Sequence, residues 1–261
     1  MIPKKIHLTW FSGDEYPETI KKCLATWKKV LPDFEVKIWT MDMARALNIP
    51  FVNEALDARK WAFAGDVVRA YAVWSEGGVY MDTDIYLLKR FDEFMNYPMV
   101  FFMEINEARW KLSHSEDLVD DEGLCIKPEQ YVKGKQIQAA LFMAEQGQQC
   151  LKQIVDYYRS VHFTDKEEYV GMNLISPWVY AKTLEKYGFR YKDEDQHFEN
   201  IRVYNSSYVG QSKYDHEANA FALHLADHAW DKRKGWRLIK YKLSSSVIGP
   251  FLIKIKRLCS I

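Results

Sequence analysis

Hydrophobic and polar positions follow two periods along the chain, one typical of strands and one typical of helices. Short apolar runs bounded by polar residues predict strands at Ile6–Trp10, Phe34–Trp39, Val79–Met81, Ile85–Leu88, Met99–Met103, Ile201–Tyr204 and Phe221–Leu225. Apolar residues that recur every three or four positions predict helices at Asp42–Leu47, Phe51–Ala55, Arg59–Trp74, Gln136–Tyr158 and Gly171–Tyr187, and a further helix that begins at Pro17. Pro177 either kinks the last of these helices or marks its true start.

The repeated alternation of strand and helix predicts an α/β fold, with a central sheet covered by helices. No internal repeat, low-complexity tract or linker interrupts the chain. We therefore expect one domain over residues 1–231, followed by a basic amphipathic extension over residues 232–261.

Composition limits the classes of function. The 261 residues suffice for a large core, and 48% of them are hydrophobic. Basic and acidic residues number 36 each, and this neutral balance argues against a nucleic-acid partner. The four cysteines are far apart, which argues against a zinc site or a disulfide framework. The sequence contains neither a secretory leader nor a long apolar run, so we expect a cytoplasmic protein.

A pair of carboxylates is the most informative feature. In extended backbone, residues two apart point to the same side, so Asp82 and Asp84 can aim at one ligand. Carboxylate oxygens suit Mg²⁺ or Mn²⁺, and such an ion can neutralise a diphosphate leaving group. An isolated Asp-x-Asp is usually a surface turn, but this pair follows a buried helix, a helix-ending Gly77-Gly78 and an apolar strand. We expect the two glycines to let backbone approach the ligand closely.

The predicted helix before this strand carries charged residues on an apolar background. Asp66 and Arg69 are three positions apart and share a face, and Arg59 lies on roughly the same stripe. Two interpretations stay open. The pair forms an internal salt bridge, or it grips the hydroxyls or the phosphate of a ligand.

Three segments together resemble glycosyltransferase family 32. They are Ile2-Pro3-Lys4-Lys5-Ile6-His7-Leu8-Thr9-Trp10, the stretch from Ala64-Gly65-Asp66-Val67-Val68-Arg69 to Gly77-Gly78-Val79-Tyr80-Met81-Asp82-Thr83-Asp84, and Ala222-Leu223-His224 followed by Trp230. That family includes bacterial capsular and surface polysaccharide glycosyltransferases, yeast mannosyltransferases and clostridial glucosylating toxins. The resemblance covers the front third of the chain and one C-terminal stretch.

The resemblance implies a GT-A fold, in which a single Rossmann-like α/β domain binds a nucleotide sugar. It also implies Mn²⁺ or Mg²⁺, a UDP- or GDP-linked sugar donor, and retention of the anomeric configuration. Carried over by position, the metal ligands are Asp84, Asp82 and His224, the donor-binding residues are Thr9, Trp10, Asp66, Arg69, Asp82 and Trp230, and the catalytic residues are Asp84 and Asp82.

The third motif departs from the family pattern. Many relatives have Gly-Ser-Trp where this chain has His228-Ala229-Trp230. His228 is therefore a rival metal ligand, and His224 is either a ligand or a buried histidine on an apolar strand.

The resemblance implies transfer of a hexose from a nucleoside-diphosphate sugar to a glycan or lipid-linked acceptor, in surface polysaccharide biosynthesis. One alternative is another metal-dependent nucleotide-diphosphate enzyme, such as a nucleotidyltransferase. The loop at residues 11–14 lacks the glycine-rich basic sequence usual in that class. The other alternative is a non-catalytic sugar-binding module, for which buried charge at Asp66 and Arg69 would be an unexplained cost.

The C-terminal segment after Asp231 combines many lysines and arginines with apolar residues. Such a segment fits peripheral binding to anionic lipid at the inner face of the cell membrane. The alternative is a terminal helix that packs on the domain and leaves its lysines in water.

Overall fold

A computed structural model describes residues 1–163, 175–211 and 216–226. Residues 1–226 form one compact unit built on an eight-stranded mixed sheet. Its strand order is β2-β1-β3-β7-β5-β9-β8, and β6 pairs with β5 beside this path. A second sheet has the order β10-β11-β4. The predicted fold class, an α/β domain with a mixed central sheet and flanking helices, is confirmed. The predicted domain boundary at residue 231 lies outside the described residues.

The strands of the two sheets are short. They are β1 (Lys5–Thr9), β2 (Glu35–Trp39), β3 (Gly78–Met81), β4 (Ile85–Leu87), β5 (Met99–Ile105), β6 (Lys135–Ile137), β7 (Leu141–Ala144), β8 (Gln196–Phe198), β9 (Ile201–Tyr204), β10 (Val209–Gly210) and β11 (Ala222–His224). β1 pairs in parallel with β2 and β3, and β7 runs antiparallel to both β3 and β5. The carboxyl ends of β1, β3 and β5 therefore lie at one edge of the sheet.

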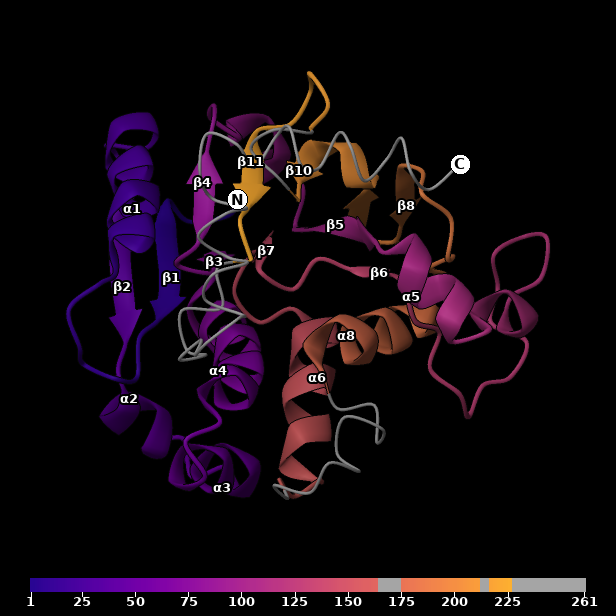
Figure 1. Ribbon diagram of the computed structural model, residues 1–261, viewed down its shortest axis with the longest axis horizontal. Coiled ribbons are helices and arrows are strands. Elements are labelled where there is room, and N and C mark those ends of the chain that lie inside the picture. Colours follow the sequence, from indigo (N-terminus) through magenta and orange to yellow (C-terminus); the bar gives the residue numbers. More distant parts are fainter. Residues whose placement is uncertain (164–174, 212–215, 227–261) are drawn as a thin grey trace, which may run out of the picture. The chain divides into compact units, whose positions relative to one another are not determined.

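The α-helices of the described residues are α1 (Glu18–Val30), α2 (Met41–Arg45), α3 (Pro50–Asp57), α4 (Trp61–Glu76), α5 (Glu107–Leu112), α6 (Gln149–Arg159) and α8 (Ser176–Leu184). Figure 1 shows α4, α6 and α8 together on one side of the central strands, with β4, β10 and β11 on the other. None of the described helices combines the length and the apolar character that a membrane span needs.

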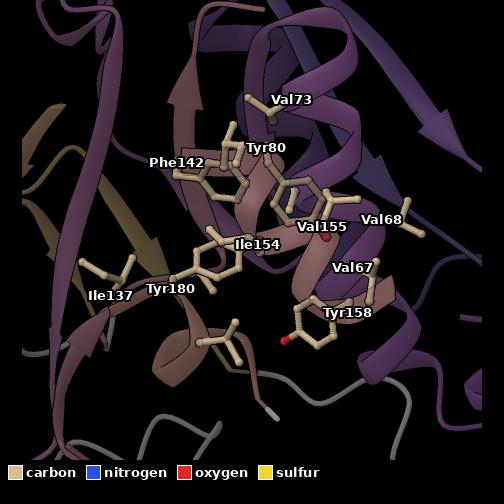
Figure 2. Close-up of a cluster of buried hydrophobic side chains, with 14 of the residues drawn as sticks. Val67, Val68, Val73, Tyr80, Ile137, Phe142, Ile154, Val155, Tyr158 and Tyr180 are labelled. Carbon is tan, nitrogen blue, oxygen red and sulfur yellow. The ribbon is translucent and has the colours of Figure 1, made fainter. Parts of the chain in front are cut away.

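A hydrophobic core lies on each face of the central sheet. The first is built from α3, α4, α6 and α8 against one face, and Figure 2 shows part of it around Phe142. The ring of Phe142 stacks on those of Tyr80 and Phe101 and meets that of Tyr180 edge-on. The second core joins the other face to α1 and the smaller sheet. Packing on both faces of the sheet thus fixes the edge at which β1, β3 and β5 end.

The predicted helix Gln136–Tyr158 is wrong in its first half. The structure has β6 and β7 there, and the helix α6 begins only at Gln149. Every residue of β7 is buried, because β7 lies between β3 and β5 in the middle of the sheet. A strand buried on both faces has no alternation of polar and apolar residues, so its periodicity cannot be distinguished from that of a buried helix.

Two smaller predictions about helix ends are settled by backbone geometry. Pro177 lies in the first turn of α8, so it marks the start of a helix and does not kink one. Arg59 lies before α4 in a left-handed conformation with φ of 56°, and its side chain is exposed. The prediction that Arg59 extends the charged stripe of α4 is therefore wrong.

Gly77 and Gly78 end α4 and begin β3, which places them at the opposite end of the strand from Asp82. A Cβ on Gly78 would lie 2.5 Å from the carbonyl oxygen of Lys5 on β1. The expectation that these glycines bring backbone close to a ligand is therefore wrong, because the close approach is to the neighbouring strand. His7 completes this junction, since its Nε2 donates to the carbonyl of Gly77 while its Nδ1 accepts from Trp39.

This junction predicts a large difference between two glycine-to-alanine substitutions. Gly78 has φ of 110° and no room for a Cβ, whereas Gly13 has φ of 69° and nothing within 4 Å of the added atom. We expect Gly13→Ala to lower the free energy of unfolding by about 1–2 kcal/mol, the cost of a left-handed alanine. Gly78→Ala should cost several times as much, because the clash adds to the strain. Urea denaturation of both variants measures this, and equal losses would contradict the close packing of β3 on β1.

Candidate active site

The candidate site lies at the carboxyl ends of the parallel strands β1 and β3. His7 pairs with Tyr80 in the register of these strands, so Thr9 at the end of β1 lies level with Asp82 just after β3. The backbone amide of Asp82 donates to the carbonyl of Ala140, which precedes β7. This is the edge at which open α/β sheets bind ligands.

Asp82, Asp84 and His224 come together although His224 lies 140 positions after Asp84 in the sequence. One ligand atom from each of them lies within 4.8 Å of the others. The Nε2 atom of His224 is 3.6 Å from a carboxylate oxygen of Asp84, and both side chains are mostly buried. Strand pairing brings them close, since His224 on β11 lies opposite Ile85 on β4 and the amide of Leu225 donates to the carbonyl of Asp84. Two carboxylates and an imidazole form a donor set that suits a divalent cation.

The side chain of Asp82 is oriented by a hydrogen bond from Tyr80. The phenol hydroxyl of Tyr80 donates to Oδ1 of Asp82 at 2.7 Å and lies 3.1 Å from Oγ1 of Thr9. A phenol has one hydrogen, so the Thr9 hydroxyl is the donor to Tyr80. Burial, together with the charge of Asp82, raises the pKa of Tyr80 well above its ordinary value. The phenol therefore stays protonated and keeps donating to Asp82.

Arg69 joins this network from α4. Its guanidinium lies 3.2 Å from Asp66 and 3.5 Å from Asp82, and it is stacked over the ring of Tyr80 at 5.0 Å. It also donates to the carbonyl of Ala139. Burial by itself would lower the pKa of Arg69, but Asp82, Tyr80 and Asp66 together raise it, so this buried cation is permanent.

Asp66 is the more deeply placed partner of Arg69. Only 6% of it is exposed, and its carboxylate accepts hydrogen bonds from the hydroxyl of Ser176 at 2.6 Å and from the Ser176 amide at 3.2 Å. The interpretation of Asp66 and Arg69 as an internal salt bridge is therefore confirmed. Contact of either residue with a donor sugar stays a prediction.

Trp10 flanks the site on the β1 side. Its ring lies 4.6 Å from that of Tyr16, and its Nε1 donates to the carbonyl of Asp14. The ring remains partly exposed, and its stacking on a nucleotide base stays a prediction. Trp230 and the rival ligand His228 lie outside the described residues.

Two residues of this network were missed by the sequence analysis. Tyr80 stands two positions before Asp82 on an extended segment, so the alternation of a strand already places both on one side. Ser176 precedes a proline at a helix start, a position that favours a serine cap. Its partner Asp66 is 110 positions away, however, and no local pattern connects the two.

Comparison with known proteins confirms the resemblance found in the sequence. Residues 17–101 match the family model described as "Glycosyltransferase sugar-binding region containing DXD motif". Inositol phosphoceramide mannosyltransferase 2 of Schizosaccharomyces pombe is 34% identical over 103 residues, which cover 38% of this chain and 30% of that protein. Inositol phosphoceramide mannosyltransferase 3 of the same yeast is 31% identical over 101 residues, which cover 37% of this chain and 28% of that protein.

The chain thus spans less than a third of the length of these yeast relatives. Among solved structures, PaToxG glycosyltransferase is similar with a TM-score of 0.46 and 16% identity, over 71% of this chain and 69% of that one.

The buried pair at Asp66 predicts a stability difference between two similar substitutions. Asp66→Asn removes the charge that offsets Arg69 in the interior, and breaking a buried pair costs about 3–5 kcal/mol. Asp57 forms an exposed pair with Arg45 at 2.7 Å, and Asp57→Asn should cost less than about 1 kcal/mol. Urea denaturation at pH 7 compares the two. A loss at Asp66 no larger than that at Asp57 would show that Arg69 does not depend on this carboxylate.

Proposed function

We propose that this protein is a metal-dependent glycosyltransferase that moves a hexose from a nucleoside-diphosphate sugar to a glycan or lipid-linked acceptor. The observation that carries the proposal is the cluster of Asp82, Asp84 and His224 at the carboxyl edge of the sheet. The Asp-x-Asp part of this cluster lies inside the segment that matches the family model.

The residues at the cluster fit a divalent cation. Their donor atoms are carboxylate oxygens and one imidazole nitrogen, which suit Mn²⁺ or Mg²⁺. Arg69 and Tyr80 both contact Oδ1 of Asp82, so this oxygen is already occupied by protein donors. The other carboxylate oxygen of Asp82 is the one we assign to the ion, together with Asp84 and Nε2 of His224.

A bound divalent ion would neutralise the charge that develops on the diphosphate as the bond to the sugar breaks. The chain itself orients the ligands of the ion through fixed hydrogen bonds, and such preorganised groups need no rearrangement during the reaction. Arg69, held permanently charged beside Asp82, offsets part of the negative charge of the carboxylates on the donor side. We infer that Thr9 and Trp10 line the base, and that the anomeric configuration is retained, as the family resemblance implies.

The yeast relatives suggest where to look for substrates. Both are named as inositol phosphoceramide mannosyltransferases, so a mannosyl donor and a lipid-linked acceptor are the first candidates. The matched region is under a third of each relative, and these substrates are therefore the first to test. We further propose a role in surface polysaccharide synthesis at the cytoplasmic side of the membrane.

A melting-temperature screen with GDP-mannose, UDP-glucose and UDP-galactose tests the reaction class. At about 100 times Kd, one of these donors should stabilise the native state by about 2.7 kcal/mol, which raises Tm by roughly 5–10 °C, and only with Mn²⁺ present. Asp84→Asn should remove this rise in Tm. It should also lower the rate at which turnover releases the nucleoside diphosphate, by more than the roughly 100-fold that loss of a hydrogen-bond partner of a metal ligand costs. Asp121→Asn, at an exposed carboxylate, is the matched control and should change neither. If no donor raises Tm with any divalent ion, the proposal fails.

The basic C-terminal segment leads to a separate proposal, that the protein binds anionic membranes through residues 232–261. Its support is the sequence pattern alone, because these residues lie outside the described ranges. In liposome flotation, the full chain should float with vesicles that contain phosphatidylserine and lose this in high salt, since screening weakens such contacts. A chain that ends at Asp231 should stay in the lower fraction. Equal flotation of both chains would contradict membrane binding through this segment.

A further inference from the structure

The imidazole of His224 has one nitrogen that the proposed metal site does not use. Its Nε2 faces Asp84, whereas its Nδ1 is buried and has no hydrogen-bond partner among the described residues. A metal-ligating histidine almost always donates its second ring N–H to a carboxylate, a carbonyl or water, and this partner fixes the ring. The buried Nδ1 therefore requires an explanation of its own.

Glu104 is the carboxylate placed to provide this partner. It lies near the carboxyl end of β5, on the face shared by Val100 and Phe102, because side chains two apart on a strand point the same way. The ring of Phe102 lies 5.1 Å from that of Phe221, which immediately precedes β11. On β11, Ala222 belongs to the same hydrophobic core as Phe102, and His224 lies two positions further along the strand on the same face.

Electrostatics agree with this placement. Burial raises the pKa of Glu104, and the charge of His224 is the largest effect that opposes the rise. The core packing and the electrostatic effect of His224 on Glu104 thus both indicate that the two side chains lie near each other.

The carboxylate of Glu104 is itself held by a hydrogen bond from a residue of β6. Its partner across the β5–β6 ladder is Gln136, whose side chain hydrogen-bonds the Glu104 carboxylate. The amide oxygen of Gln136 accepts from the indole of Trp178 on α8 at 2.8 Å and from the amide of Gly134 at 3.3 Å. With its oxygen used in this way, Gln136 offers its NH₂ group to Glu104.

We propose that Glu104 is a positioning residue for the metal site: with the ion bound, its carboxylate would accept the Nδ1–H of His224 and so keep Nε2 available to the ion. This inference rests on the proposed metal site. It assigns a purpose to a partly buried carboxylate that no step of the reaction uses. It also extends the support of the site through Gln136 to Trp178 on α8.

Direct Mn²⁺ binding, measured by electron paramagnetic resonance of the free ion, tests the inference without turnover. We expect Glu104→Leu to weaken binding about 10- to 100-fold, the range for lost outer partners of metal ligands. Glu104→Gln keeps a carbonyl acceptor and should lose less. Glu107→Gln, at an exposed carboxylate three positions away, is the control and should bind as the unchanged protein does. Urea denaturation verifies that each variant is folded.

A double-mutant cycle separates positioning from general damage. If Glu104 acts through His224, then Glu104→Leu combined with His224→Ala should bind Mn²⁺ no more weakly than His224→Ala alone. In the Mg²⁺-loaded protein, the Nδ1 proton of His224 should give a slowly exchanging downfield proton resonance. The signal is assigned by its loss in His224→Ala, and it should also vanish in Glu104→Leu.

Three results would overturn the inference: Mn²⁺ affinity within twofold of normal in Glu104→Leu, additive losses in the double variant, or an unchanged Nδ1 resonance. If the unchanged protein binds no Mn²⁺, the metal site fails and this inference fails with it. If Mn²⁺ binds with the expected coupling but no sugar is transferred, the proposed reaction fails while the role of Glu104 stands.

Discussion

The guanidinium of Arg69 lies in the interior between the carboxylates of Asp66 and Asp82, and the carboxyl edge of the sheet depends on it. A buried cation without acceptors is very unfavourable, so α4, β3 and the turn before β7 must come together around it. The ring of Tyr80 beneath it and the carbonyl of Ala139 complete its surroundings. As a result, Arg69 and Tyr80 already hold one carboxylate oxygen of Asp82 before any ligand binds.

Helix α8 supports both sides of the same edge. At its first residue, Ser176 holds the carboxylate of Asp66 and thereby the position of Arg69. Two residues later the indole of Trp178 holds Gln136, which contacts Glu104 on the His224 side. A helix placed by the hydrophobic core thus fixes polar groups on both sides of the candidate metal site. This explains how ligands from distant segments can keep a defined geometry.

Sequence patterns predicted the amphipathic helix and those short apolar runs that glycines or polar residues bound at their ends. The amphipathic α1 and the strands β1 and β3 appear close to their predicted bounds. The pattern failed at residues 136–148, because β7 is buried on every side and has no polar face to reveal its period. It failed again at Gly77-Gly78, where the glycines were assigned to a ligand but serve the packing of β3 against β1.

By itself, the sequence determined the α/β class of the fold and a pair of carboxylates, Asp82 and Asp84, that lie close enough to aim at one ligand. The class of fold follows from the local alternation of strands and helices. The two carboxylates converge for a reason other than the expected one, because Asp82 and Asp84 lie in a turn closed by a hydrogen bond from the amide of Ile85 to the carbonyl of Asp82, and not in extended backbone. Only the tertiary structure decided which distant groups complete the site. His224 reaches Asp84 through the pairing of β11 with β4, and Ser176 reaches Asp66 across 110 positions. Such contacts depend on how the core packs, and core packing is a property of the whole chain that no local pattern contains.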